Sequence, residues 1–210
     1  MCFEIGPSMR LNSLRRALYP IAAAASVCLG TASVHAADAG NGFAVRGLGS
    51  QACSAYVSAL SKPEEFAHYG NWLMGYATAH NRILPDTYDI IPTEPGVDFP
   101  NVVAVICRTN SQMLLETAAS SAVTAIKPLR QTASSPLVVV SADGKSVSIH
   151  QESLKRLQAA LIAKQVFKGA ATGTPSPQFT DALKVFQRRE AIPVTGLPDI
   201  DTFIRAIVKH

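Results

Sequence analysis

Side chains that could bind a metal or transfer protons are sparse in the 210-residue sequence, and their spacing argues against catalysis. His68 and His80 are twelve residues apart, which on one helix would separate them by ~18 Å, too far to share a metal ion. Glu64 and Glu65 directly follow Pro63, an arrangement typical of the first turn of a helix rather than of a pair of catalytic carboxyl groups. We therefore predict that the protein is not an enzyme and has no metal or other cofactor.

Other catalytic signatures are also missing from the sequence. It contains no H-E-x-x-H, G-x-S-x-G or S-x-x-K motif, and no glycine-rich phosphate loop follows a predicted strand. Four acidic residues at 84–100 are interleaved with prolines and lack the glycine spacing of an EF-hand. We interpret residues 84–100 as a solvated acidic loop, with a calcium site as the alternative. A cell-wall hydrolase with an unrecognised active site also stays open.

The first 36 residues have the pattern of a secretory signal peptide. Arg10, Arg15 and Arg16 precede an apolar run at 17–34, and Val34-His35-Ala36 supplies a cleavage site of the small-x-small type. We predict that residues 1–36 are removed on export to the periplasm or cell envelope, and that no membrane segment remains. The alternative is an uncleaved membrane anchor.

Two cysteines remain after this cleavage. Cys53 and Cys107 form an even pair in an oxidising compartment, where disulfides persist. A bond between them would close a loop of roughly 55 residues and contribute about 3–4 kcal/mol to stability. The alternative, a pair of reactive thiols, lacks a nearby histidine or a C-x-x-C spacing that would activate them.

Charge is distributed unevenly along the chain, whose formal net charge is +4. Residues 37–130 hold six Lys/Arg and eight Asp/Glu, whereas residues 151–210 hold nine and five. A basic second half suits an anionic polymer such as the cell wall. Because the chain is predicted to be exported and its aromatic residues lie mainly on helix faces, we do not expect nucleic acid as a partner.

The elements that must position these residues divide into three parts. Residues 37–130 form a helical domain in which aromatic and apolar residues recur at intervals of three and four from Phe66 to Ala77. Further helices are expected from Asn101 and, with Asn110 as N-cap, up to Pro128. Residues 131–150 contain two β-prone runs around Asp143-Gly144, which predict a β-hairpin that connects two domains.

Residues 151–210 predict a bundle of three short helices. Apolar residues from Leu154 to Ile162 mark the first helix, and Ser176-Pro177 supplies the N-cap and first residue of the second. Asp199 is the predicted N-cap of the third. The predicted fold class is therefore mainly α: a disulfide-linked helical domain, a short β-hairpin connector and a three-helix bundle.

The bundle resembles the peptidoglycan-binding domain type 1 family. The residues that carry the resemblance are, in order, Leu157-Gln158-Ala159-Ala160-Leu161, Gly169, Gly173, Thr180-Asp181-Ala182-Leu183, Phe186-Gln187-Arg188, Val194-Thr195-Gly196 and Asp201-Thr202. The chain departs from the family pattern at Gln165-Val166-Phe167, where the family has Gly-Tyr, and at Thr172-Gly173, where it has Asp-Gly. The resemblance implies a three-helix bundle that binds peptidoglycan without catalysis.

Four residues of this segment are our candidate ligand-binding residues: Gln158, Gln187, Arg188 and Thr195. A glutamine amide both donates and accepts hydrogen bonds, as sugar hydroxyls and peptide groups require, and arginine can meet wall carboxylates. The alternatives are that each glutamine binds a loop carbonyl and that Arg188 belongs to an ordinary solvated helix end.

A second, shorter pattern lies in the helical domain. Residues 37–130 resemble the acid-stress chaperone HdeA and the Rap1a/Tai immunity family. The residues that carry this resemblance are Cys53, Trp72, Gly75, Tyr76, Asn81, Cys107 and Ala118. This resemblance implies a disulfide-linked helical domain that binds another periplasmic protein. We therefore predict a non-catalytic envelope protein that binds peptidoglycan and presents a protein-binding domain. The alternatives are a wall-anchored chaperone or an immunity-type inhibitor.

Overall fold

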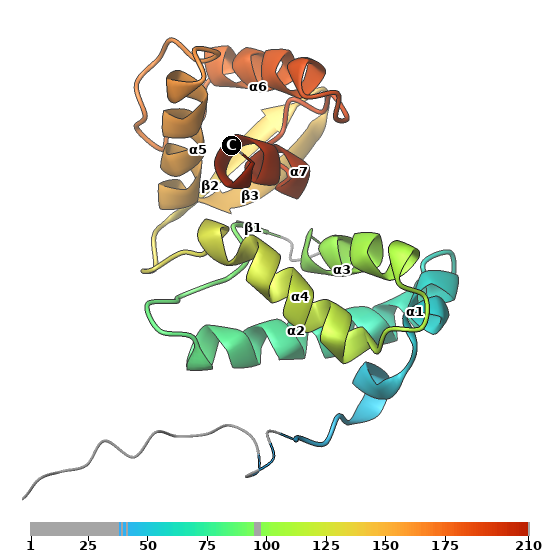
Figure 1. Ribbon diagram of the computed structural model, residues 1–210. Coiled ribbons are helices and arrows are strands. Elements are labelled where there is room, and N and C mark those ends of the chain that lie inside the picture. Colours follow the sequence, from blue (N-terminus) through green and yellow to red (C-terminus); the bar gives the residue numbers. More distant parts are fainter. Residues whose placement is uncertain (1–37, 39, 41, 95–97, 210) are drawn as a thin grey trace, which may run out of the picture. The chain divides into compact units, whose positions relative to one another are not determined.

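Helices make up most of the structure. The computed structural model describes residues 38, 40, 42–94 and 98–209, so the predicted signal peptide and its cleavage site lie outside the described residues. Within them the chain forms seven α-helices and a small three-stranded sheet (Figure 1), which confirms the mainly-α prediction. No described helix is both long enough and apolar enough to cross a membrane.

The first four helices surround a core that the predicted disulfide crosses. They are α1 (Cys53–Ala59), α2 (Pro63–Ile83), α3 (Asp98–Thr109) and α4 (Leu115–Ile126), with the short 3-10 helices η1 (Gly47–Ser50) before them and η2 (Lys127–Leu129) after them. The predicted apolar face of α2 is confirmed, since Tyr69, Leu73 and Ala77 are buried. Cys53 of α1 and Cys107 of α3 form the disulfide, and both are buried.

Two helix boundaries differ from the prediction. Asn110 is not the N-cap of α4, because its side chain instead donates to the Ile106 carbonyl at the end of α3. The N-cap is Leu114, which an isolated bridge to Ala52 holds in extended geometry. Helix α3 begins at Asp98, not Asn101, since Pro100 falls in its first turn, where no backbone N–H is needed.

The predicted hairpin is confirmed and gains a third strand. Strands β2 (Leu137–Ala142) and β3 (Lys145–His150) pair in antiparallel register, and the turn residues Asp143 and Gly144 have φ values of 49° and 75°. Strand β1 (Thr93–Glu94) pairs with the other side of β3, with Thr93 opposite Ile149. Part of the predicted 84–100 loop is therefore a strand, whose partner lies more than fifty residues further along the chain.

Three helices complete the structure around the hairpin. They are α5 (Gln151–Ala163), α6 (Pro177–Arg189) and α7 (Ile200–Phe203), which continues as a π-helical turn, η3 (Ile204–Val208). Both predicted N-caps are confirmed, because Ser176 accepts from the Phe179 N–H and Asp199 from the Thr202 N–H. In Figure 1, α5 and α6 border the hairpin and α7 lies across it. Buried apolar side chains fill the space between them: Val140, Ile149, Leu154, Leu157, Leu161, Phe179, Leu183, Phe186 and Phe203.

Loss of the disulfide should strongly destabilise the first four helices. The Cys53→Ser/Cys107→Ser double variant should lose about 3–4 kcal/mol in free energy of unfolding, because the unfolded chain regains the entropy of an open loop. Urea unfolding with and without reductant measures the loss. The reduced wild type should match the variant, and a variant as stable as the oxidised wild type would contradict the prediction.

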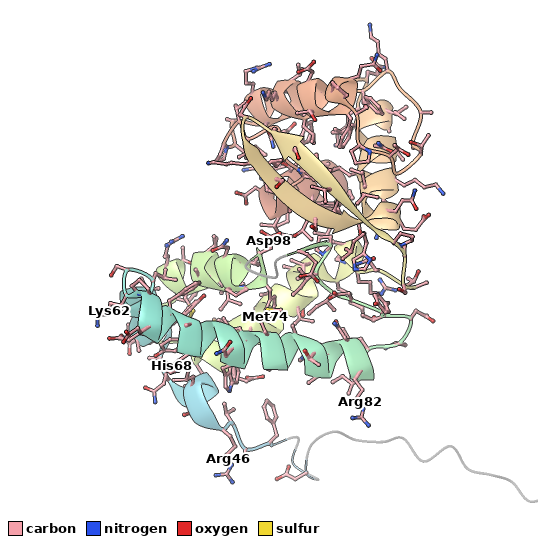
Figure 2. All side chains as sticks on the ribbon, turned by 180° about the vertical axis from the view of Figure 1, so that it is seen from behind. Arg46, Lys62, His68, Met74, Arg82 and Asp98 are labelled. Atoms are coloured by element: carbon pink, nitrogen blue, oxygen red, sulfur yellow. A yellow bond between two sulfur atoms is a disulfide. The ribbon has the colours of Figure 1, made fainter. Side chains whose placement is uncertain are left out.

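Asp98 stands at the start of α3 (labelled in Figure 2), within electrostatic reach of two further carboxylates, Asp199 and Asp201. Burial raises the pKa of Asp98; the Thr93 hydroxyl opposes this shift, and the nearby Asp199 and Asp201 carboxylates add to it. Burial likewise raises the pKa of Asp201, with Asp199 adding to the shift and Arg205 opposing it. Both groups therefore bind protons more readily in the folded than in the unfolded chain.

The upward shift of the Asp98 pKa predicts how this residue affects stability as pH changes. A raised carboxyl pKa contributes stability that is fully present below the unfolded value and is lost as pH rises through the folded value. The Asp98→Asn variant, which keeps an oxygen for Thr93, should therefore have a higher Tm than wild type at pH 7 and no advantage near pH 3.5. Thermal unfolding across this range tests it; an equal or larger advantage at low pH would contradict the stated sign.

Candidate functional site

Two buried glutamines hold the two loops that join the last three helices. The Gln158 Nε2 of α5 donates to the Thr174 carbonyl (2.9 Å), and its Oε1 accepts from the Gly173 N–H (2.7 Å). The Gln187 Nε2 of α6 donates to the Leu197 carbonyl (2.9 Å), and its Oε1 accepts from the Gly196 N–H (2.8 Å). In both cases one amide pairs with the N–H of a glycine and the C=O of the residue that follows it.

The glycines in these pairs have a backbone that other residues rarely adopt. Gly173 and Gly196 have φ values of +75° and +66°, in the left-handed region. A Cβ on Gly173 would lie 2.6 Å from the carbonyl oxygen of Gln151, at the start of α5. Each glycine thus lets its loop come close enough to a helix for a glutamine side chain to bind it.

The four predicted ligand-binding residues are not gathered at one surface. Gln158 and Gln187 are 1% and 0% exposed, so their amides serve the loops, and a direct ligand contact would require a loop to open. The Thr195 hydroxyl belongs to the Gln187 network, since it accepts from Gln187 Nε2 (2.9 Å) and donates to Asp199 Oδ2 (2.7 Å). Arg188 is exposed near the end of α6. Gln158 lies under the other loop.

The surface above Gln158 is a groove, which we call the α5–α6 groove. It consists of two adjoining hollows of about 490 and 260 Å³ that share Phe167, Gly169 and Gln178. The Phe167 ring packs edge-on against Phe179 at 5.4 Å between centroids and is 6% exposed. The further lining residues of the two hollows are Gln158, Val166, Lys168, Ala170, Thr172, Thr174, Pro175, Ser176, Asp181, Ala182 and Val185.

The groove offers the mixture of groups that a glycopeptide polymer requires. Val185 is 49% exposed, and Gln178, Lys168 and Asp181 are exposed polar neighbours. Such side chains can contact the faces of sugar rings and bond hydroxyl or amide groups. Sequence reasoning overlooked Gln178, Asp181 and Val185, and registered Phe167 only as a departure from the family pattern. The departure from the family pattern at Gln165-Val166-Phe167 was the signal for the groove in the sequence, because this segment begins the loop that lines it.

The described residues contain no cluster of three or more His, Cys, Asp or Glu side chains that could hold a metal ion. His68 is exposed on α2 (Figure 2), His80 stacks on Tyr76 with 4.4 Å between ring centroids, and His150 is buried beside the Ser135 carbonyl at 2.8 Å. These three histidines therefore lie in three separate environments.

The role of Gln187 can be separated from that of its exposed neighbour. Gln187→Leu would leave the buried Gly196 N–H without a partner and would remove one of the donors to the Leu197 C=O, which keeps the Asp199 N–H; it should lower the free energy of unfolding by about 1–3 kcal/mol. Arg188→Ala should change it by about 0.5 kcal/mol or less. Urea unfolding of both variants tests this; a Gln187→Leu chain as stable as wild type would show that the amide does not hold the loop.

Comparison with known proteins identifies one segment. Residues 150–205 match the model of the family described as "Putative peptidoglycan binding domain". The match covers α5, α6, α7 and both glutamine-held loops, and it confirms the predicted resemblance for these residues. Comparisons with curated proteins and with solved structures give no match. The similarity of residues 37–130 to HdeA and the Rap1a/Tai family remains a prediction.

Proposed function

We propose that this chain is a non-catalytic protein of the cell envelope that binds peptidoglycan through the α5–α6 groove. The observation that carries the proposal is the match of residues 150–205 to a peptidoglycan-binding family, together with an exposed groove inside that segment. The groove combines apolar and hydrogen-bonding side chains and has no pair of carboxylates on its lining. Binding without bond cleavage suits such a surface.

Export is supported by the disulfide as well as by the N-terminal sequence. The Cys53–Cys107 bond lies buried in the core of the first four helices, and structural disulfides of this kind persist in oxidising compartments. We place the chain in the periplasm, with residues 1–36 removed as a signal peptide. The net positive charge of residues 151–210 also favours an anionic wall polymer.

We further propose that the first four helices present a surface to another envelope protein. Ile83 and Tyr88, at and just after the end of α2, are 66% and 47% exposed, although both have large apolar side chains. Apolar side chains exposed close together are a feature of protein-binding surfaces. Under this proposal the wall-binding domain localises the chain, and the helical domain meets its partner there.

Wall binding can be tested by co-sedimentation of the purified chain with insoluble peptidoglycan at moderate salt. Wild type should pellet with the wall, and a Gln178→Ala/Val185→Ser variant should bind about tenfold more weakly, because it loses a hydrogen bond and an apolar contact. The wall suspension should keep its turbidity throughout, since no bond is cleaved.

A matched variant outside the groove controls for surface changes. Gln112→Ala/Val105→Ser alters an exposed glutamine in the connection between α3 and α4 and an exposed valine of α3, and it should pellet like wild type. A wild-type chain that stays in the supernatant would refute wall binding. A groove variant that pellets like its control would place the binding surface elsewhere, and loss of turbidity would refute the non-catalytic role.

A further inference from the structure

A pocket of about 230 Å³ lies where the chain leaves η2 and where α5 begins. Its lining comes from two stretches of sequence: Pro128, Arg130, Gln131, Thr132 and Ala133 on one side, and Glu152, Ser153 and Arg156 on the other. Only the second stretch falls within residues 150–205. The pocket is therefore distinct from the α5–α6 groove and is not contained in the matched segment.

Three buried polar atoms of this lining have no hydrogen-bond partner. Gln131 is 4% exposed, and neither its Oε1 nor its Nε2 is bonded; Ser153 is 1% exposed, and its Oγ is unbonded. Leaving a buried amide or hydroxyl unpaired is unfavourable, and most buried polar groups in folded proteins are paired. All three atoms belong to residues that line one pocket, which points to a ligand that would pair with them once a small movement of the lining gives it access, as a ligand of Gln158 would also require.

The main chain around Gln131 is firmly placed. Its N–H donates to the Asp89 carbonyl (2.7 Å), and its carbonyl accepts from the Tyr88 N–H (2.7 Å). This bridge fixes the main chain of the residue that carries the unpaired amide, so only its side chain and the lining around it need to move when a ligand arrives.

The pocket also carries a net positive charge, since its lining has two arginines, Arg130 and Arg156, and one carboxylate, Glu152. The Arg156 guanidinium donates to the carbonyls of Pro128, Leu129 and Arg130 at 2.6, 3.2 and 2.8 Å, and Arg130 donates to those of Asp86 and Lys127 at 3.2 and 3.3 Å. These acceptors carry no formal charge. The ion pairs among the described residues are Lys62–Glu65, Lys155–Glu152 and Lys184–Asp143, so neither arginine has a carboxylate partner there.

The pKa of Arg156 is also affected by the positive charge of Arg130. Burial, followed by the nearby charge of Arg130, lowers the pKa of Arg156. An arginine still stays protonated at neutral pH, and a guanidinium has five N–H donors in a plane that matches a carboxylate. With three donors of Arg156 directed at carbonyls, donors remain on both arginines for an anionic ligand.

The chemistry of the unpaired atoms further restricts the class of ligand that the pocket can bind. The arginine N–H groups, the Ser153 hydroxyl and Gln131 Nε2 can all donate to an anion, but Gln131 Oε1 can only accept. Acetate, for example, has no hydrogen to give it. The C-terminal residue of a peptide has both a carboxylate and its own amide N–H. We propose that this pocket binds the C-terminal carboxylate of a short peptide, and that the amide N–H of the same residue donates to Gln131 Oε1.

Isothermal titration calorimetry of the full chain with soluble probes tests the proposal. The probes are N-acetyl-D-alanyl-D-alanine, N-acetyl-L-alanyl-L-alanine, the C-terminal amide of each, acetate and inorganic phosphate. We expect at least one dipeptide acid to bind saturably, and its amide, acetate and phosphate to bind about tenfold or more weakly. Preference for the D-form would indicate a wall peptide as the source, and preference for the L-form a protein C-terminus.

Variants of the unpaired groups distinguish binding from a structural role. Gln131→Leu and Ser153→Ala each remove a polar side chain that has no partner, so the Tm should stay equal or rise while dipeptide affinity falls about tenfold. Arg156→Lys keeps the charge but loses the planar pair of donors, and should also bind more weakly. Arg46→Gln changes an exposed arginine that lies before η1, away from the pocket (labelled in Figure 2); it is the matched charge control and should bind like wild type.

Three results would overturn the proposal: no dipeptide acid binds, acetate or phosphate binds as tightly as the dipeptides, or the Gln131→Leu and Ser153→Ala variants keep wild-type affinity. The proposal goes beyond wall binding by the groove. Because its probes are soluble and its variants lie outside the groove, its failure is distinguishable from a failure of the co-sedimentation experiment.

Discussion

The segment that matches the peptidoglycan-binding family model depends on one repeated interaction, the pairing of a helical glutamine amide with the N–H of a left-handed glycine and the next carbonyl. The Gln158 and Gln187 amides each make this pair, at loops that differ in length. Loops normally leave their backbone groups to water, but here a buried side chain satisfies them. Three short helices with a small core thereby gain fixed connections, and the groove above Gln158 is built on one of them.

The elements with strong local signals were predictable from the sequence. Ser176 and Asp199 cap the helices that they were expected to cap, and Asp143-Gly144 makes the expected turn. In each case a few neighbouring residues determine the geometry. The Cys53–Cys107 bond was predictable for a different reason, because only these two cysteines remain beyond the expected cleavage site. The elements held by distant partners were missed: β1 pairs with β3, and a bridge to Ala52 sets the start of α4.

The difference between local signals and contacts with distant residues also explains which parts of the functional surfaces could be predicted. The family pattern drew attention to Gln158 and Gln187, which lie on α5 and α6, but a motif does not tell whether a glutamine faces solvent or the backbone. The structure places both amides inside, and it shows Gln178 and Val185 on the surface of the groove instead. No sequence pattern indicates the pocket that contains Gln131 and Ser153. Its two sides come from separate segments of the chain, and its distinguishing feature is that buried polar atoms have no hydrogen-bond partner.

Strand β1 links a segment inside the loop closed by the disulfide to a strand outside that loop. This strand lies between Cys53 and Cys107, inside the segment that the disulfide closes, whereas its partner β3 lies well beyond Cys107. A chain cut before residue 145 would keep both cysteines of the disulfide but would lose the strand with which Thr93 and Glu94 pair. The ring of chain that the disulfide closes is thereby joined to a segment well outside it.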